Sequence, residues 1–166
     1  MRGYALVFIC LLNAIVADSI SQGRVPRLTP KKGQHVHREI KVGDRSRLDI
    51  VIAGEERPDE NNGAVYIEVK NVTMLSSVVS DRADFPDAVT ERGRKHLREL
   101  IRLKKMGHRA VLFLLLGRSD CNSVGFAQEI DPAYCEALLE AAEEGVEIIS
   151  HKLAFRGSRM RLGEEV

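Results

Sequence analysis

The sequence predicts an α/β fold in which helices flank a mixed central β-sheet. Two short β-branched segments, Arg47–Ile52 and Ala64–Lys70, are joined by a polar stretch and are typical of neighbouring strands. The uninterrupted apolar run Arg109–Leu116 has the length of a strand that is covered on both faces. Helical patterns lie before and after this run, and the alternation of strands with helices indicates the α/β class.

Residues 24–46 predict a loop and a short edge strand around Val36–Val42. This stretch is charged and is interrupted by residues that favour turns, namely Pro26, Pro30, Gly33 and Gly43. The polar segment Gly54–Gly63 predicts a hairpin connection between the two β-branched strands. At 166 residues the chain has the length of one medium domain, predicted to span residues 1–166.

Residues 71–85 are predicted as a loop, after which a helix is expected to begin at Phe85-Pro86-Asp87. This helix would carry apolar residues on one face and end near Gly107; the apolar residues are Leu97, Leu100 and Ile101. Basic residues would occupy much of the remaining surface of the helix.

A second helix is expected to open at Asp131, because Asp is a favoured N-cap and Pro132 suits the first helical position. It should stop at Gly145, and Val146–Ser150 predicts a further strand. The second half of the chain therefore alternates strand and helix.

Three polar side chains interrupt the β-branched strands. Asp49 lies in the first strand, whereas Glu68 and Lys70 lie two residues apart in the second and so point to the same face. An Asp followed by Glu-x-Lys on the next strand is the arrangement of metal-dependent PD-(D/E)xK nucleases, which have a restriction-endonuclease-like fold. Asp49 and Glu68 would bind Mg²⁺ or Mn²⁺ together with the main-chain carbonyl of Val69. Lys70 would position the attacking water or help to deprotonate it.

The spacing of these residues also fits a structural role. Two carboxylates about 6 Å apart repel by roughly 3 kcal/mol at an effective dielectric near 20. Without a cation between them, one should take up a proton or turn to solvent. In the alternative interpretation Asp49 ends an edge strand, and Glu68 pairs with Lys70 on a solvated face.

Several motifs surround these residues in a fixed order. They are Glu39-Ile40-Lys41, Ser46-Arg47-Leu48-Asp49, Tyr66-Ile67-Glu68-Val69-Lys70-Asn71-Val72-Thr73, Phe85-Pro86-Asp87-Ala88-Val89-Thr90-Glu91-Arg92-Gly93, Lys95-His96-Leu97-Arg98-Glu99-Leu100, Arg109-Ala110-Val111, Ile130-Asp131-Pro132-x-Tyr134 and Gly145-Val146-Glu147-Ile148. Over roughly residues 4 to 152 the sequence resembles the sugar fermentation stimulation protein A family. The resemblance implies a PD-(D/E)xK nuclease-like domain that binds nucleic acid. Members are also described as DNA-binding regulators of sugar (maltose) fermentation genes.

The resemblance carries further expectations. Ala5–Cys10 would be a strand that leads through Asn13 into a helix ending near Gly23. Glu39 is a candidate accessory metal ligand, and a solvated strand acid is the alternative. Family members usually carry an additional N-terminal OB-like barrel, to which nothing here corresponds. Either the chain is a truncated or divergent member, or its start lies within a longer reading frame.

Charge is unevenly distributed, although the net charge is only +1. Residues 90–109 contain eight Lys or Arg against Glu91 and Glu99, and residues 129–147 contain seven acids and no Lys or Arg. The resemblance places Thr90, Glu91, Arg92, Lys95 and His96 at the entrance of the site. The predicted nucleic-acid contacts are Arg47, Arg92, Lys95, His96, Arg98 and Arg102. A solvated helix face is the alternative for these charges.

The sequence predicts a cytoplasmic protein. Its three cysteines lack CxxC spacing, which favours a reducing compartment over a disulfide framework. The apolar run Ala5–Val16 resembles a secretory signal, but Asn13 interrupts it and no A-x-A ending follows. It is also shorter than the roughly 20 apolar residues of a membrane span.

Two functions are consistent with these patterns. The first is Mg²⁺- or Mn²⁺-dependent hydrolysis of phosphodiester bonds in DNA or RNA, and the second is a non-enzymatic DNA-binding regulator of sugar (maltose) fermentation genes. The presence of Asp49, Glu68 and Lys70 together favours the enzyme, since buried acids near phosphate do not help a pure binder. DNA and/or RNA are the expected partners, and a homodimer is compatible with the sequence.

Overall fold

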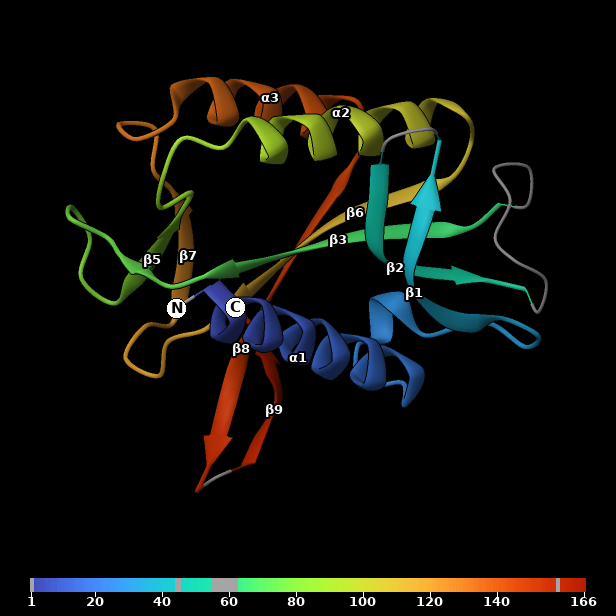
Figure 1. Ribbon diagram of the computed structural model, residues 1–166, viewed down its shortest axis with the longest axis horizontal. Coiled ribbons are helices and arrows are strands. Elements are labelled where there is room, and N and C mark those ends of the chain that lie inside the picture. The colour runs from blue at the N-terminus through green and yellow to red at the C-terminus, as the bar shows by residue number, and fades with distance from the viewer. Residues whose placement is uncertain (1, 44–45, 55–62, 158) are drawn as a thin grey trace.

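The computed structural model describes residues 2–43, 46–54, 63–157 and 159–166, and its centre is a six-stranded mixed sheet (Figure 1). The strands are β1 (His35–Val42), β2 (Ser46–Ala53), β3 (Val65–Val72), β6 (Arg109–Leu116), β8 (Glu147–Arg156) and β9 (Arg159–Glu165), in the spatial order β1-β2-β3-β6-β8-β9. Strands β3, β6 and β8 are parallel to one another, and the remaining neighbours are antiparallel. The predicted α/β class with a mixed central sheet is confirmed.

Helices cover both faces of this sheet (Figure 1). Helix α1 (Arg2–Ser21) lies on one face, and the adjacent helices α2 (Glu91–Lys105) and α3 (Pro132–Glu143) lie on the other. Two separate apolar cores result, because successive strand side chains point to opposite faces. The α1 core includes Val16, Ile20, Ile67 and Phe113, and the α2–α3 core includes Leu97, Leu100, Tyr66 and Leu112. Within the described ranges, none of the helices combines the length and the apolar character needed for a membrane crossing.

A second, three-stranded sheet stands at the carboxyl end of β3 and β6. It consists of β4 (Met74–Leu75), β5 (Arg82–Phe85) and β7 (Ser123–Phe126) in the order β4-β5-β7. The prediction of an unbroken loop over residues 71–85 was therefore wrong. The sheet buries Asp84, whose carboxylate accepts hydrogen bonds from Arg82 Nε (2.7 Å) and Nη2 (3.0 Å). A buried carboxylate that is neutralised by a partly exposed arginine leaves no apolar strand pattern in the sequence.

Two predicted boundaries are corrected by the structure. Ala5–Cys10 is helical and belongs to α1, because a short apolar run fits a strand or a buried helix equally well. Helix α2 begins at Glu91 rather than at Phe85, which lies in β5. Its N-cap is Thr90, whose hydroxyl accepts from Gly93 N (3.0 Å), while Thr90 N donates to the Asp131 carboxylate (2.8 Å). The cap at Thr90 sets the start of the helix, and the tertiary contact with Asp131 holds the capping residue in place.

Other predicted elements are confirmed. The edge strand around Val36–Val42 corresponds to β1, and Asp131 caps α3 by accepting from Tyr134 N (3.0 Å). Strand β8 begins at the predicted place but continues to Arg156 and pairs with β9, which the sequence did not predict. Most of the predicted Gly54–Gly63 connection lies outside the described residues.

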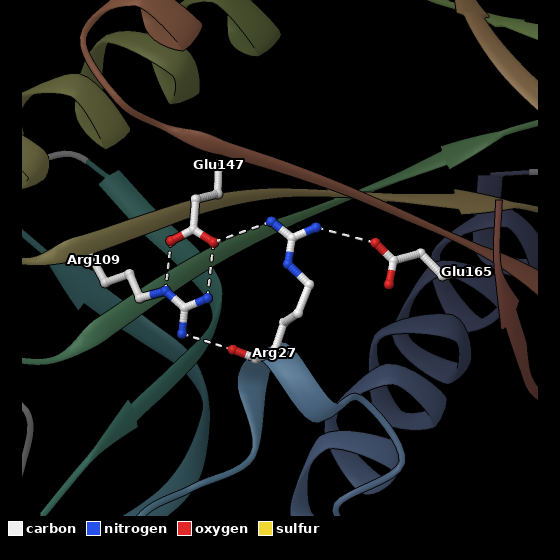
Figure 2. A network of polar contacts seen from close by, with 4 residues as sticks. All are labelled: Arg27, Arg109, Glu147 and Glu165. Atoms are coloured by element: carbon white, nitrogen blue, oxygen red, sulfur yellow. Dashed lines mark hydrogen bonds and ion pairs between the residues drawn. The ribbon is translucent and has the colours of Figure 1, made fainter.

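An ion-pair network secures the amino ends of β6 and β8 (Figure 2). Arg109 donates to both carboxylate oxygens of Glu147, at 2.5 and 2.8 Å, and to the main-chain carbonyl of Arg27 (2.7 Å). Arg27, in the 3₁₀ turn η1 (Pro26–Leu28), also pairs with Glu147 (3.5 Å) and Glu165 (3.1 Å). The hydrogen bonds from Arg109 hold the pKa of Glu147 below its usual range. The network fixes the amino ends of β6 and β8, where Glu147 is level with Ile67, one residue before Glu68.

Candidate active site

The strand register places the predicted acidic residues side by side. Strands β2 and β3 are antiparallel, with Ile50 opposite Ile67 and Val51 opposite Tyr66. The next residue of this antiparallel pair is Asp49 on β2, and it lies beside Glu68 on β3. Asp49, Glu68 and Lys70 line one cavity of about 600 Å³, together with side chains of α1 and α2.

Glu68 is a buried, charged group. Its side chain is 3% exposed, and its Oε1 accepts a hydrogen bond from Lys70 Nζ (2.6 Å) and is in contact with His96 Nδ1. Burial alone would raise the pKa of Glu68, but the hydrogen bond from His96 and the charge of Lys70 outweigh burial and lower the pKa. The alternative interpretation is thus half correct: the pair with Lys70 forms, but on a buried face.

His96 lies close to both Glu68 and Lys70. Its Nδ1 is also 3.3 Å from Lys70 Nζ. One nitrogen cannot donate to the carboxylate and accept from the ammonium at once. The closer contact with Glu68 favours the proton on Nδ1, so that both His96 and Lys70 donate to the same oxygen.

The second oxygen of Glu68 has no such donor. Oε2 is buried and makes no hydrogen bond within the described part of the chain. An unsatisfied buried acceptor is costly, more so when it carries charge. This oxygen belongs to a side chain that lines the cavity, and it is free to coordinate a cation.

Asp49 is held by helix α1 and by the neighbouring strand β3. Its Oδ1 accepts from Asn13 Nδ2 of α1 (2.8 Å), and its Oδ2 accepts from the main-chain nitrogen of Val69 (2.9 Å). Burial, with a further contribution from the negative charge of Glu68, raises the pKa of Asp49 to about 6. The negative charge of Glu68 therefore disfavours the ionisation of Asp49, as expected for neighbouring acids.

Two residues of the site were not predicted from the sequence. Asn13 interrupts an apolar run, and such a polar interruption of a buried helix face was its only signal. Tyr134 is fully buried, packs edge-to-face on Phe85 with ring centres 5.2 Å apart, and its hydroxyl has no hydrogen-bond partner among the described residues. Burial and the negative charge of Glu68 raise the pKa of Tyr134, which places its ring within electrostatic range of that carboxylate.

The donor set fits a hard divalent cation only in part. Asp49 and Glu68 supply carboxylate oxygens at one cavity, and the unpartnered Oε2 is an oxygen that such a cation prefers. Among the described residues, however, no three His, Cys, Asp or Glu side chains are gathered as a metal cluster. Glu39 pairs with Arg47 (3.4 Å), and neither residue is among those lining the acidic cavity. Its predicted role as an accessory ligand stays a prediction.

A second, basic cavity adjoins the acidic one. It measures about 1100 Å³ and is lined by six basic residues and two acids, together with Ser46 and His96; the charged ones are Lys41, Arg47, Arg92, Lys95, Arg98, Arg102, Glu91 and Glu99. All six predicted nucleic-acid contacts line this basic cavity. The two cavities share Arg92 and His96, so they form a continuous surface.

The basic residues of α2 differ in their environment. Arg92, Lys95 and Arg98 are exposed and three residues apart, so they share one helix face. Arg102 donates to Glu99 (2.8 Å), which offsets part of its charge. Arg94 faces the other way and pairs with Asp131 (2.9 Å), joining α2 to α3.

The mixed sheet, its flanking helices and the carboxylates on β2 and β3 define an α/β domain with a nuclease-like, restriction-endonuclease-type fold. The family described as "Sugar fermentation stimulation protein RE domain" matches residues 10–159, and the chain belongs to this family.

Individual relatives agree with this assignment. A sugar fermentation stimulation protein homolog of Shewanella loihica is 40% identical over 151 residues, which cover 90% of this chain and 60% of the relative. The homolog of Rhodospirillum rubrum is 42% identical over 139 residues, covering 82% and 56%. The structure described as Pyrococcus furiosus SfsA in complex with Ca²⁺ superimposes with a TM-score of 0.74 at 27% identity, covering 91% of this chain and 61% of that one. The chain thus spans about three fifths of the length of these relatives.

Proposed function

We propose that this chain is a metal-dependent phosphodiesterase that acts on nucleic acid. The observation that carries the proposal is Glu68, a buried and ionised carboxylate whose Oε1 accepts from Lys70 and whose Oε2 has no hydrogen-bond partner among the described residues. Asp49 on the neighbouring strand lines the same cavity. Structural ion pairs normally satisfy both oxygens of a buried carboxylate, so the vacant acceptor favours a ligand at this point.

Asp49, Glu68 and the main-chain carbonyl of Val69 would hold Mg²⁺ or Mn²⁺. The Pyrococcus relative is described as a complex with Ca²⁺, another hard cation that takes oxygen ligands. When bound, such a cation would supply a Lewis acid for a phosphate oxygen and lower the pKa of a water molecule.

The residues around the proposed cation site would have three different roles: orienting the carboxylates, donating to the attacking water or the phosphate, and holding neighbouring phosphates. The amide of Asn13 and the main-chain nitrogen of Val69 fix the orientation of Asp49, and His96 does the same for Glu68. Lys70 is 16% exposed, so its ammonium reaches the cavity and can donate to an attacking water or to a phosphate oxygen. The exposed cations of α2 would hold neighbouring phosphates without reading base sequence.

The test is an incubation with single- and double-stranded DNA and RNA in the presence of Mg²⁺, Mn²⁺ or EDTA. Cleavage should require the divalent cation and should fall by at least about a hundredfold in Asp49→Asn, Glu68→Gln and Lys70→Ala. Lys31→Ala, at an exposed lysine in neither cavity, is the matched control and should cleave normally. Cleavage that survives EDTA or Lys70→Ala would show that this site does not carry the reaction.

A non-enzymatic DNA-binding regulator is the second candidate. The observation that favours it is that the described residues contain no group of three or more His, Cys, Asp or Glu side chains arranged to hold a metal ion. The names of the relatives refer to sugar fermentation rather than to nucleic-acid cleavage. Tight binding of DNA that is unaffected by divalent cations, with no cleavage of any substrate, would support this function.

A further inference from the structure

The outer hairpin formed by β8 and β9 has two chemically different faces. Its register pairs Leu153 with Leu162, Ala154 with Arg161, Phe155 with Met160 and Arg156 with Arg159. Because side chains alternate along a strand, Leu153 and Leu162 share one face, which is buried in the α1 core. The opposite face carries Lys152, Arg156, Arg159 and Arg161, which we call the basic arm face. In Figure 1 the hairpin projects at the bottom, beyond α1.

The arginines of the basic arm face form no ion pair with the residues that the structure describes. Arg156 and Arg159 are both exposed and lie directly opposite each other. Like charges in this position destabilise a strand pair. Of the residues that the structure describes, none forms an ion pair with Arg156, Arg159 or Arg161. Lys152 donates to Asn122 Oδ1 (2.6 Å), a neutral group.

The basic arm face lies on the same side of the sheet as the acidic site. Across the parallel strands, Glu68 is level with Leu112 and Ile148, and both of these apolar residues pack in the α2–α3 core. Lys152 and Arg156 are separated from Ile148 by even numbers of residues, so they point to the same side. A hollow of about 390 Å³ opens between Lys152, Arg161 and Ser119; Glu164 also lines it.

The register also sets the separation between the arm and the site. Ser150 is level with Lys70, two strands away, which corresponds to about 10 Å. Arg156 lies six residues further along β8, or about 20 Å. The tip of the arm is therefore about 22 Å from Lys70, the length of about six base pairs of B-form DNA.

We propose that the basic arm face is a second contact for double-stranded DNA, so that a duplex is held on one flank by α2 and on the other by β8–β9. This inference rests on the proposed nucleic-acid function of the acidic site. The basic cavity and the basic arm face offer cations to the phosphates of a duplex, and Phe155, which lines the hollow beside the arm, belongs to the Leu153 face of the hairpin. A two-stranded ribbon is matched by the major groove of B-form DNA and not by the narrow major groove of RNA.

The experiment measures binding rather than cleavage. Affinity for a DNA duplex of about two helical turns is followed by fluorescence anisotropy in EDTA, as a function of salt, for the wild-type chain and Arg156→Gln/Arg159→Gln. Losing two phosphate contacts should reduce the slope of log affinity against log salt by about 1.8. Between about 50 and 200 mM salt the affinity of the variant should then fall about twelvefold less than that of the wild type. Its melting temperature should not decrease, because the substitution removes a like-charge pair.

Lys31→Gln/Lys32→Gln is the matched control, with the same loss of charge at exposed residues outside both surfaces. Its salt dependence should equal that of the wild type. A wild-type chain that binds no duplex would overturn the proposed function together with this inference. A wild-type chain that binds while the arm variant keeps the full slope, or shares a reduced slope with the control, overturns this inference alone. Equal or tighter binding of an RNA duplex, with the same dependence on the arm, overturns the assignment to DNA.

Discussion

The raised pKa of Asp49 has a direct consequence for folding, which Asp49→Asn can test. Burial and the charge of Glu68 raise this pKa from 3.8 to about 6. The folded state therefore holds the proton more tightly than the unfolded chain does. The contribution of Asp49 to stability is fully present below pH about 4 and is lost as the pH rises to about 6. A shift of about two pH units corresponds to about 3 kcal/mol.

An asparagine at this position removes the charge and keeps the size. The amide of Asn13 can rotate to pair with either end of the new amide, so the contact between α1 and β2 can persist. In EDTA, Asp49→Asn should therefore be more stable than the wild type above pH 6, by up to about 3 kcal/mol. The two proteins should approach equal stability near pH 4. The free energy of unfolding in urea, measured across this pH range, gives the difference directly.

Asp87→Asn is the appropriate control, because Asp87 is an exposed acid that lines the same cavity. Its stability should stay within about 0.5 kcal/mol of the wild type throughout. Glu68, with its lowered pKa, contributes stability that is lost as the pH falls, so the comparison between variants is more informative than either curve alone. An Asp49→Asn protein that is less stable than the wild type at pH 7 in EDTA would refute the argument.

The other predictions concern the surroundings of the site. Tyr134→Phe should leave stability unchanged or raise it by up to about 1 kcal/mol, because the buried hydroxyl has no partner among the described residues; a loss measured by urea unfolding would contradict this. Asp131→Ala should lower the melting temperature by several degrees, since this carboxylate caps α3 and accepts from Arg94 and Thr90, whereas Asp131→Asn should retain the cap and lose less. Lys95→Ala/Arg98→Ala should reduce the salt slope of nucleic-acid binding by about 1.8 with unchanged stability, and a full slope would place the phosphate track elsewhere.

The strands β2, β3 and β6 could be predicted from the sequence because their burial is encoded locally. Each is a run of β-branched or aliphatic residues of strand length, and the whole of β6 from Ala110 onward is buried. The cap at Asp131 was likewise a local signal, since its partner Tyr134 N is three residues away. The shared face of Glu68 and Lys70 was also a local signal, because residues two apart on a strand point to the same side.

The elements that escaped prediction depend on partners distant in sequence. Strand β5 pairs with β7, setting Arg82 opposite Ser123, and neither strand is apolar enough to indicate its fold by itself. The contact of His96 with Glu68 joins residues 28 positions apart, so the sequence placed His96 at the site entrance and on the nucleic-acid surface but did not predict this contact. Both cases required knowledge of which residues distant in the sequence meet in the fold.

The arrangement of donors around the two carboxylates explains why a cation would be useful at this site under the proposed function. Both oxygens of Asp49 and one oxygen of Glu68 are oriented by fixed donors, whereas Glu68 Oε2 is not. Without a cation, this oxygen remains buried without a hydrogen-bond partner among the described residues, and Asp49 tends to take up a proton. Each of these costs is relieved when a positive charge lies between the two acids, so the unfavourable free energy of the cation-free state would reappear as affinity for the cation. A purely structural ion pair would have no such imbalance between its two oxygens.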